Sequence, residues 1–186
     1  SLDIRMAKDN FNNEIGMPLA ILGDYDKTGG WSFWLKVILK SLLNLAFKRN
    51  YPKTLVLEYA VDKPGDMDYL LGIAKPDIAV VTAIGEIPIH VEFYPDPEAV
   101  AKEKAKIVQA LKPEGYAVLN FDDPTVFAMR NKCKGKVLTF GFEEGADLRV
   151  ASFLNRSEFG KPLGISFKIE TKDNFVPVRI DDVFGK

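Results

Sequence analysis

The sequence predicts an α/β fold with a mostly parallel sheet, helices on both of its faces and a small antiparallel β extension. Two patterns support this. Up to about residue 146, short apolar runs alternate with helical patterns, which is typical of parallel strands joined by helical crossovers. After that point the apolar runs are separated only by turn residues, as antiparallel strands are. We expect one domain over residues 1–186, with an α/β core at 1–146 and the extension at 147–186.

Each expected element has its own local signal. Two of the helical stretches open with Asp-Pro, which places proline in the first turn of a helix. The expected strands are "TLVLEYA" (54–60), "DIAVVTAIG" (77–85), "YAVLNFDD" (116–123) and "KVLTFGF" (136–142), and the expected helices are "GDMDYLLGIAK" (65–75), "DPEAVAKEKAKIVQALK" (96–112) and "DPTVFAMRNK" (123–132). The late strands are "DLRVASFLN" (147–155), "LGISFKIET" (163–171) and "NFVPVRI" (174–180).

Composition narrows the class of protein. Lys and Arg total 25 against 26 Asp and Glu, giving a net charge of −1, so no basic field favours a nucleic-acid partner. Cys133 is the chain's single cysteine and cannot form an internal disulfide, and no signal peptide opens the chain. We therefore expect a cytoplasmic protein in which Cys133 is a structural or incidental thiol.

Residues 31–51 form an unusual segment. A narrow polar stripe runs along an otherwise apolar helix, at Ser32, Lys36, Lys40, Asn44 and Lys48. The segment is too short and too charged for a confident membrane span. We expect a helix buried on the sheet, with two alternatives: a surface exposed by truncation, or an interfacial helix lying on the inner membrane.

Polar residues follow the expected strands at the edge where α/β sheets bind ligands. They are Glu58, Thr82, Asn120, Asp122 and Asp123. An acid after a hydrophobic strand, as in "LVLE", is a usual place for a magnesium carboxylate beside a phosphate site, although a solvated or capping glutamate is the alternative. The only histidine, His90, follows the Thr82 strand, and an isolated histidine is more often a structural residue than a ligand.

Five segments of the sequence together carry a family pattern. They are "NFNNEIGMPLAIL" (10–22), "KPGDM" (63–67), "PDIAVVTAIG" (76–85), "HVEFYPDPEAVAKEKAKIV" (90–108) and "LNFDDP" (119–124). In their order and rough spacing, these segments resemble the Mur ligase central domain. Within the family the sequence looks most like the members that add a dipeptide to a nucleotide-sugar tripeptide. Folylpolyglutamate synthases share the architecture but match "NFNNEIG" less well.

The resemblance implies roles for individual residues. Glu58 and His90 would be magnesium ligands near the ATP phosphates, and Lys104 would be carbamylated to hold a second magnesium, with Lys102 as the neighbour that could be confused with it. A carbamate is a hard oxygen ligand, which magnesium prefers, whereas an ammonium repels a metal. A solvated helix face is the alternative for this lysine run. The resemblance also places Asn12, Asn13 and Thr82 at the substrate, and Asn120 and Asp123 near the nucleotide.

The resemblance implies an ATP-dependent, amide-bond-forming ligase of peptidoglycan precursor synthesis that uses Mg²⁺, a nucleotide-sugar peptide and an amino acid or dipeptide. Two features depart from the family. Ala83 replaces an expected asparagine, and no G-x-x-x-x-G-K-[ST] phosphate loop occurs in these 186 residues. We therefore expect a fragment that is inactive on its own. The alternative is a non-catalytic module of the same fold that binds a nucleotide-sugar or a partner.

Overall fold

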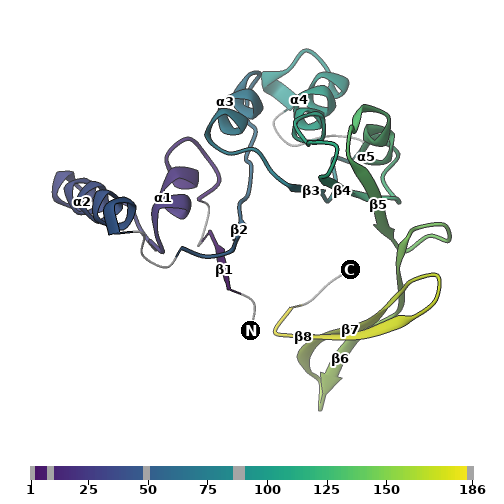
Figure 1. The fold of residues 1–186 in the computed structure, drawn as a ribbon. Coiled ribbons are helices and arrows are strands. Elements are labelled where there is room, and N and C mark those ends of the chain that lie inside the picture. Colours follow the sequence, from purple (N-terminus) through teal and green to yellow (C-terminus); the bar gives the residue numbers. More distant parts are fainter. Residues whose placement is uncertain (1–2, 8–10, 48–50, 86–90, 184–186) are drawn as a thin grey trace. The chain divides into compact units, whose positions relative to one another are not determined.

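The computed structural model describes residues 3–7, 11–47, 51–85 and 91–183. The chain divides into two compact units, Ser1–Ala74 (unit 1) and Lys75–Lys186 (unit 2) (Figure 1). The sequence did not predict a division at this position. Among the described residues, no helix has both the length and the apolar character needed to cross a membrane.

The described residues of unit 1 form a two-stranded parallel sheet and three helices. Strands β1 (Ile4–Met6) and β2 (Thr54–Val56) pair in parallel, with Arg5 opposite Leu55. The helices are α1 (Gly16–Leu22), α2 (Trp31–Phe47) and α3 (Asp66–Ile73). The expected strand at 54–60 and the expected helix at 65–75 are confirmed in shorter form, whereas β1 was not predicted.

Local hydrogen bonds determine where α1 and α3 begin. The side-chain oxygen of Asn13 accepts from the backbone N–H groups of Ile15 at 3.2 Å and Gly16 at 2.9 Å. Before α3, Gly65 has a φ of 95°, a conformation that glycine adopts without steric cost. The Asp66 carboxylate accepts from the N–H groups of the two residues 62 and 63 at 3.0 and 2.9 Å, which closes the loop before the helix.

Helix α2 differs from the expectation of a helix buried on the sheet. Val37 is its one buried residue, and Trp31 and Leu45 are each 80% exposed. The buried-helix interpretation is therefore wrong for residues 31–47. Lys48, the last member of the predicted polar stripe, lies outside the described residues.

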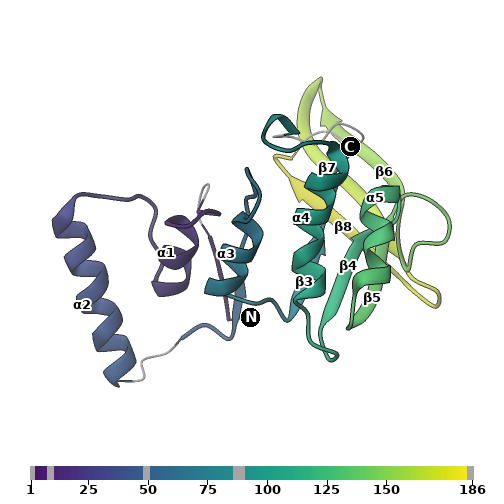
Figure 2. The same ribbon diagram turned by 90° about the horizontal axis from the view of Figure 1, so that it is seen from above.

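Unit 2 contains one six-stranded sheet in the order β3-β4-β5-β6-β7-β8 (Figure 2). The pairings from β3 to β6 are parallel, and those from β6 to β8 are antiparallel. This confirms a mostly parallel sheet with an antiparallel extension, and the extension continues the same sheet because β6 pairs with β5. The strands are β3 (Ile78–Val81), β4 (Tyr116–Asn120), β5 (Lys136–Gly141), β6 (Leu148–Glu158), β7 (Lys161–Glu170) and β8 (Phe175–Asp181).

The two Asp-Pro signals begin helices as expected. In α4 (Pro97–Gln109), the Asp96 carboxylate accepts from the N–H of Ala99 at 2.7 Å, and in α5 (Pro124–Ala128) Asp123 has the equivalent position. Two 3₁₀ turns complete the unit, η1 (Val91–Phe93) before α4 and η2 (Met129–Lys132) after α5.

Helices α4 and α5 lie over one face of the parallel strands (Figures 1 and 2). The strand residues on the buried face are small or branched, and Ala117 and Leu119 of β4 are fully buried. On the other face Ile78 and Val80 are 60% and 55% exposed. The α/β class with helices against a mostly parallel sheet is confirmed, and the described helices of unit 2 occupy one of the two expected faces.

Candidate active site

The acid after β2 is held in place by the asparagine segment that precedes α1. The Asn12 side-chain N–H donates to Glu58 Oε1 at 3.1 Å, and the backbone carbonyl oxygen of Asn12 accepts from the backbone N–H of Ala60 at 2.9 Å. These bonds join segments 46 residues apart in the chain. Glu58 is exposed, so its carboxylate is fixed in direction yet accessible to a ligand.

Asn12 and Asn13 have different structural tasks although they are neighbours. Asn12 orients Glu58, whereas the side-chain oxygen of Asn13 accepts hydrogen bonds from the backbone N–H groups at the start of helix α1. Asn13 is exposed and its side-chain amide nitrogen has no hydrogen bond among the described residues. That nitrogen is therefore available to a substrate oxygen, which is compatible with the predicted substrate contact.

In unit 2, Asn120 connects the ends of two parallel strands. Its side-chain N–H donates to the carbonyl oxygen of Thr82 at 2.7 Å, and its side-chain oxygen accepts from the N–H of Asp122 at 2.9 Å. The structure thus brings together two residues that the sequence analysis assigned to substrate and nucleotide. The side-chain nitrogen and oxygen of Asn120 both hydrogen-bond to the protein's own backbone, so this side chain fixes the conformation of the strand ends.

Asp123 anchors the loop after β3. Its Oδ2 accepts from the N–H groups of Ile84 at 2.8 Å and Gly85 at 3.0 Å, and its Oδ1 accepts from Thr125 and Val126 at 2.9 and 3.0 Å. Burial acts to raise the pKa of Asp123, but the four backbone N–H donors outweigh it and hold the pKa below its ordinary value. The carboxylate is therefore ionised and occupied, and it positions the loop backbone after β3.

Asp122 has a role that the sequence analysis did not assign. Its carboxylate accepts from the N–H of Phe142 at 2.6 Å and of Glu143 at 3.1 Å, which ties the end of β4 to the end of β5. The two adjacent aspartates therefore bind the strands on either side of β4: Asp123 binds the loop after β3, and Asp122 binds the end of β5. The available signal was the "DD" pair itself, because two acids directly after a buried strand are placed to accept from loop N–H groups.

Helix α4 presents three lysines in different electrostatic settings. Lys102 pairs with Glu98 at 3.1 Å and its side chain is 64% exposed, and Lys106 pairs with the buried Glu103 at 2.6 Å. Lys104 is half-buried and forms no ion pair with a described residue. Among the described residues, the three lysines therefore differ in whether a carboxylate pairs with the amine.

The predicted metal ligands belong to different parts of the chain. Glu58 belongs to unit 1 and Lys104 to unit 2, and His90 lies outside the described residues. Within the part of the chain that the structure describes, no group of three or more His, Cys, Asp or Glu side chains is placed to hold a metal ion. The metal roles of Glu58, His90 and Lys104 therefore stay predictions.

The fold and its strand ends define a class. Polar side chains lie at the carboxyl ends of parallel strands covered by helices, which is the arrangement of α/β ligand-binding domains. Residues 37–180 match the family described as Mur ligase middle domain. The chain belongs to this family.

Curated relatives indicate the kind of enzyme in which such a domain occurs. UDP-N-acetylmuramoyl-tripeptide–D-alanyl-D-alanine ligase of Bacillus subtilis is 27% identical over 171 residues, which is 91% of this chain and 30% of the relative. The enzyme of the same name from Mycobacterium leprae is 30% identical over 130 residues, or 70% of this chain and 20% of the relative. The chain thus spans less than a third of the length of these relatives.

The fold is also that of a solved Mur ligase. A crystal structure of MurF from Acinetobacter baumannii matches 97% of this chain and 33% of its own length, with a TM-score of 0.69 and 19% identity. At that identity the likeness concerns the fold alone. It includes both units and the antiparallel extension, because nearly the whole chain is covered.

Proposed function

We propose that this chain is the central region of an ATP-dependent ligase that forms an amide bond in peptidoglycan precursor synthesis, as its D-alanyl-D-alanine-adding relatives do. Membership of the Mur ligase middle domain family supports this. The observation that carries it is the exposed Glu58 carboxylate at the end of β2, oriented by Asn12 at 3.1 Å. Orienting an exposed acid with a side chain 46 residues away has a clear use in ligand binding.

The proposed chemistry has two steps. A terminal carboxylate of the nucleotide-sugar peptide attacks the γ-phosphorus of ATP, which forms an acyl phosphate and releases ADP. The amine of the incoming dipeptide then attacks the acyl carbon, the C–O bond to phosphate breaks, and the amine loses a proton. The products are the amide, ADP and inorganic phosphate. Fixed positive charge near the transferring phosphoryl group lowers the barrier of the first step.

The residues present fit a magnesium ion bound mainly through phosphates. Mg²⁺ commonly takes one or two protein carboxylates and completes its shell with substrate oxygens and water. Glu58 would supply one hard oxygen, a carbamate on Lys104 would supply others, and His90 would supply an imidazole nitrogen. Magnesium would neutralise charge on the ATP phosphates. The neutral amine of Lys104 forms the carbamate by attack on carbon dioxide with loss of one proton.

A non-catalytic binding module is the second candidate, favoured by the absence of a G-x-x-x-x-G-K-[ST] motif from these residues. The two candidates differ in what Lys104 does. In the whole protein that carries this chain, we expect Lys104→Ala to lower dipeptide-dependent phosphate release by about 100-fold or more. Short carboxylates such as acetate should restore part of the activity, because they can replace the carbamate oxygens.

Lys102→Ala is the matched control. Lys102 lies on the same helix, is exposed and forms only a surface ion pair with Glu98, so its loss should leave activity unchanged. Equal loss in both variants would contradict a specific role for Lys104. Dipeptide-dependent phosphate release that is absent from the wild-type protein, with nucleotide-sugar binding retained, would favour the non-catalytic module.

A further inference from the structure

Helix α2 leaves a broad apolar face uncovered. Leu35 is 47% exposed and Leu42 is 58% exposed, and the other members of the face are all more than half exposed. An α-helix advances about 100° per residue, so these positions cover about a third of its circumference. The exposed apolar face consists of Trp31, Leu35, Ile38, Leu39, Leu42 and Leu45. A contiguous apolar surface of this kind marks an interaction site.

A narrow strip attaches α2 to the rest of unit 1. Val37 is buried, and the Phe33 ring meets the edge of the Tyr25 ring with centroids 5.5 Å apart. Lys40 lies over the same Tyr25 ring at 5.5 Å. These residues fall on the side of the helix away from the exposed apolar face. The attachment therefore uses one side of α2, and the exposed apolar face on the other side takes no part in it.

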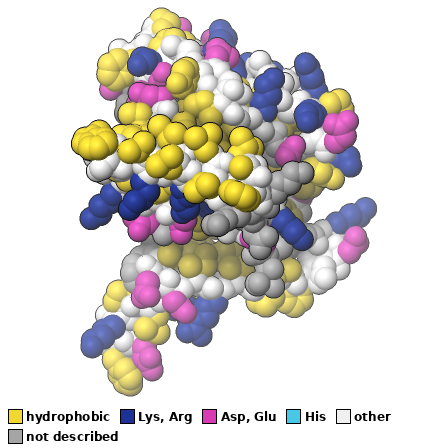
Figure 3. All heavy atoms as spheres, turned by 60° about the vertical axis from the view of Figure 1, so that its left-hand side comes forward, with side chains coloured by type: hydrophobic (Ala, Val, Ile, Leu, Met, Phe, Trp, Pro, Cys, Tyr) yellow, Lys and Arg dark blue, Asp and Glu magenta, His cyan; other side chains and the backbone are white. Residues whose placement is uncertain are grey.

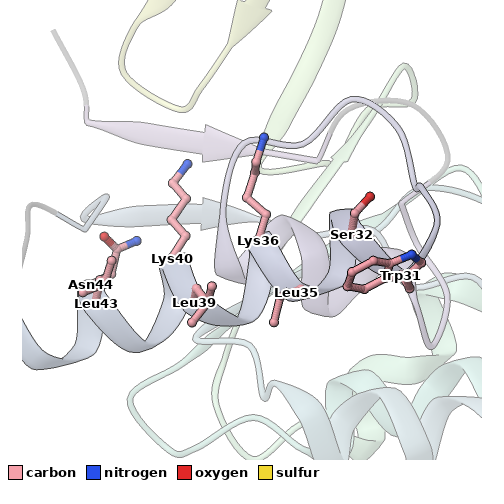
Figure 4. Close-up of a pocket in the computed structure, with 8 residues that line it drawn as sticks. All are labelled: Trp31, Ser32, Leu35, Lys36, Leu39, Lys40, Leu43 and Asn44. Carbon is pink, nitrogen blue, oxygen red and sulfur yellow. The ribbon is translucent and has the colours of Figure 1, made fainter.

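The two edges of the exposed apolar face carry residues suited to a lipid headgroup layer. Lys36 and Lys40 project from one side of α2, whereas Leu35 and Leu39 project from the other (Figure 4). Trp34 lies on the opposite edge and is 36% exposed. A row of hydrophobic side chains with basic side chains beside it is also visible on the surface (Figure 3). Residues 31–47 include no acidic side chain.

We propose that α2 binds flat in the interfacial layer of a bilayer that contains anionic lipids. Its apolar face enters the acyl boundary, Lys36 reaches headgroup phosphates, and Trp34 remains at headgroup level. The helix has 17 residues, which gives a length of about 26 Å, shorter than a hydrocarbon core of about 30 Å. This inference does not depend on the proposed ligase activity.

Charge favours an anionic surface over a second copy of the chain. Pairing two α2 helices through their apolar faces would align lysines along the rim with no acid in the helix to neutralise them. Anionic headgroups supply the missing negative charge to Lys36, which lies beside the exposed apolar face. A membrane surface therefore both buries the apolar face and neutralises its basic edge, whereas self-association only buries the apolar face.

The chain offers a direct probe of this contact. It has two tryptophans, Trp31 and Trp34, and both lie on α2, so intrinsic tryptophan emission reports on this helix. The 186-residue chain is titrated with vesicles of phosphatidylcholine containing phosphatidylglycerol, and with phosphatidylcholine vesicles alone. We expect a blue shift and vesicle flotation with the anionic mixture, quenching by brominated acyl chains, and weaker binding as salt increases.

Matched substitutions separate the two parts of the surface. Leu42→Glu removes apolar burial and should weaken binding at least about tenfold, whereas Phe159→Glu, at a residue that is 98% exposed in unit 2, should have no effect. Replacing Lys36 by glutamine should weaken binding about fivefold, since each basic residue near an anionic surface contributes about 1 kcal/mol. Replacing Lys102 by glutamine is the charge control.

Four outcomes would overturn the proposal. They are no emission shift with anionic vesicles, equal binding to neutral vesicles, equal weakening by Phe159→Glu and Leu42→Glu, and an emission shift that follows protein concentration without lipid. The last would identify a second copy as the occupant of the exposed apolar face. Because Leu42 is exposed, its substitution should leave the far-ultraviolet circular dichroism unchanged, and that spectrum verifies folding in each variant.

Discussion

Asp123→Ala should destabilise unit 2 more than the loss of a helix cap explains. The substitution removes the cap of α5, which costs about 1 kcal/mol. It also leaves the N–H of Ile84, whose bond to the carboxylate is buried, without its acceptor, which costs about 1–3 kcal/mol more. The N–H of Gly85 is only partly buried and adds less. We expect a total loss of about 2–4 kcal/mol in the free energy of unfolding.

Asp96→Ala is the matched control for this prediction. Asp96 also precedes proline and caps a helix, but it is exposed and its carboxylate accepts only from Ala99 at 2.7 Å among the described residues. Its loss should cost about 1 kcal/mol. The difference between the two variants therefore isolates the contribution of the loop N–H groups of Ile84 and Gly85.

Urea unfolding followed by far-ultraviolet circular dichroism tests the difference. Tryptophan emission is unsuitable because both tryptophans lie in unit 1. With a slope of about 2 kcal/mol per molar urea, the midpoint should fall by about 1–2 M for Asp123→Ala and about 0.5 M for Asp96→Ala. Amide exchange should show faster exchange at Ile84 and Gly85 in the first variant only. Midpoints that agree within about 0.2 M would refute the reasoning.

Three further predictions concern the same two units. The pKa of Asp123 is depressed in the folded state, so its stabilisation is present above the ordinary pKa of about 3.9 and is lost as pH falls through the lower folded pKa; urea midpoints of the wild type and Asp123→Asn should converge below about pH 4. Asn12→Ala should lower ligase activity of the whole protein by about tenfold or more by releasing Glu58. It should change the unfolding free energy by less than about 1 kcal/mol, because the hydrogen bond is exposed. Parallel assays of rate and urea midpoint test this, and full activity with a lowered urea midpoint would contradict it. Gly164→Ala should cost more than about 2 kcal/mol, because φ is 137° and the β8 backbone approaches closely, whereas Gly160→Ala, with φ of 77° and open space, should cost about 1 kcal/mol; equal thermal midpoints would contradict this.

The elements that the sequence predicted correctly are those with local causes. Helices α4 and α5 begin at Asp-Pro pairs because the capping aspartate and the N–H groups it accepts from lie within three residues of each other. The strands β3 and β4 were recognised as apolar runs bounded by turn residues. Strand β1 was missed because three residues, Ile4–Met6, carry too little pattern and gain their pairing from β2, about fifty residues later.

The sequence predicted which segments form helices and strands better than it predicted which of their side chains are buried. The sequence of α2 is apolar on most sides, and such a helix is usually buried, yet the structure leaves most of it exposed. The run "DIAVV" likewise suggests a strand buried on both faces, whereas Ile78 and Val80 are exposed on one. Periodicity reports which side chains are apolar. What covers them depends on the arrangement of distant elements, which the pattern does not contain.

The strand-end residues show the same limit in chemical terms. The sequence placed Asn120, Asp122 and Asp123 at a ligand-binding edge because α/β sheets bind ligands there. It could not distinguish side chains that contact ligand from those that build the edge, since Asp123 accepts from N–H groups 38 and 39 residues away. A carboxylate occupied by four backbone donors is a poor ligand for a cation, whereas Glu58 accepts from only Asn12 among the described residues. The division of labour between a structural aspartate and an accessible glutamate therefore follows from hydrogen-bond geometry.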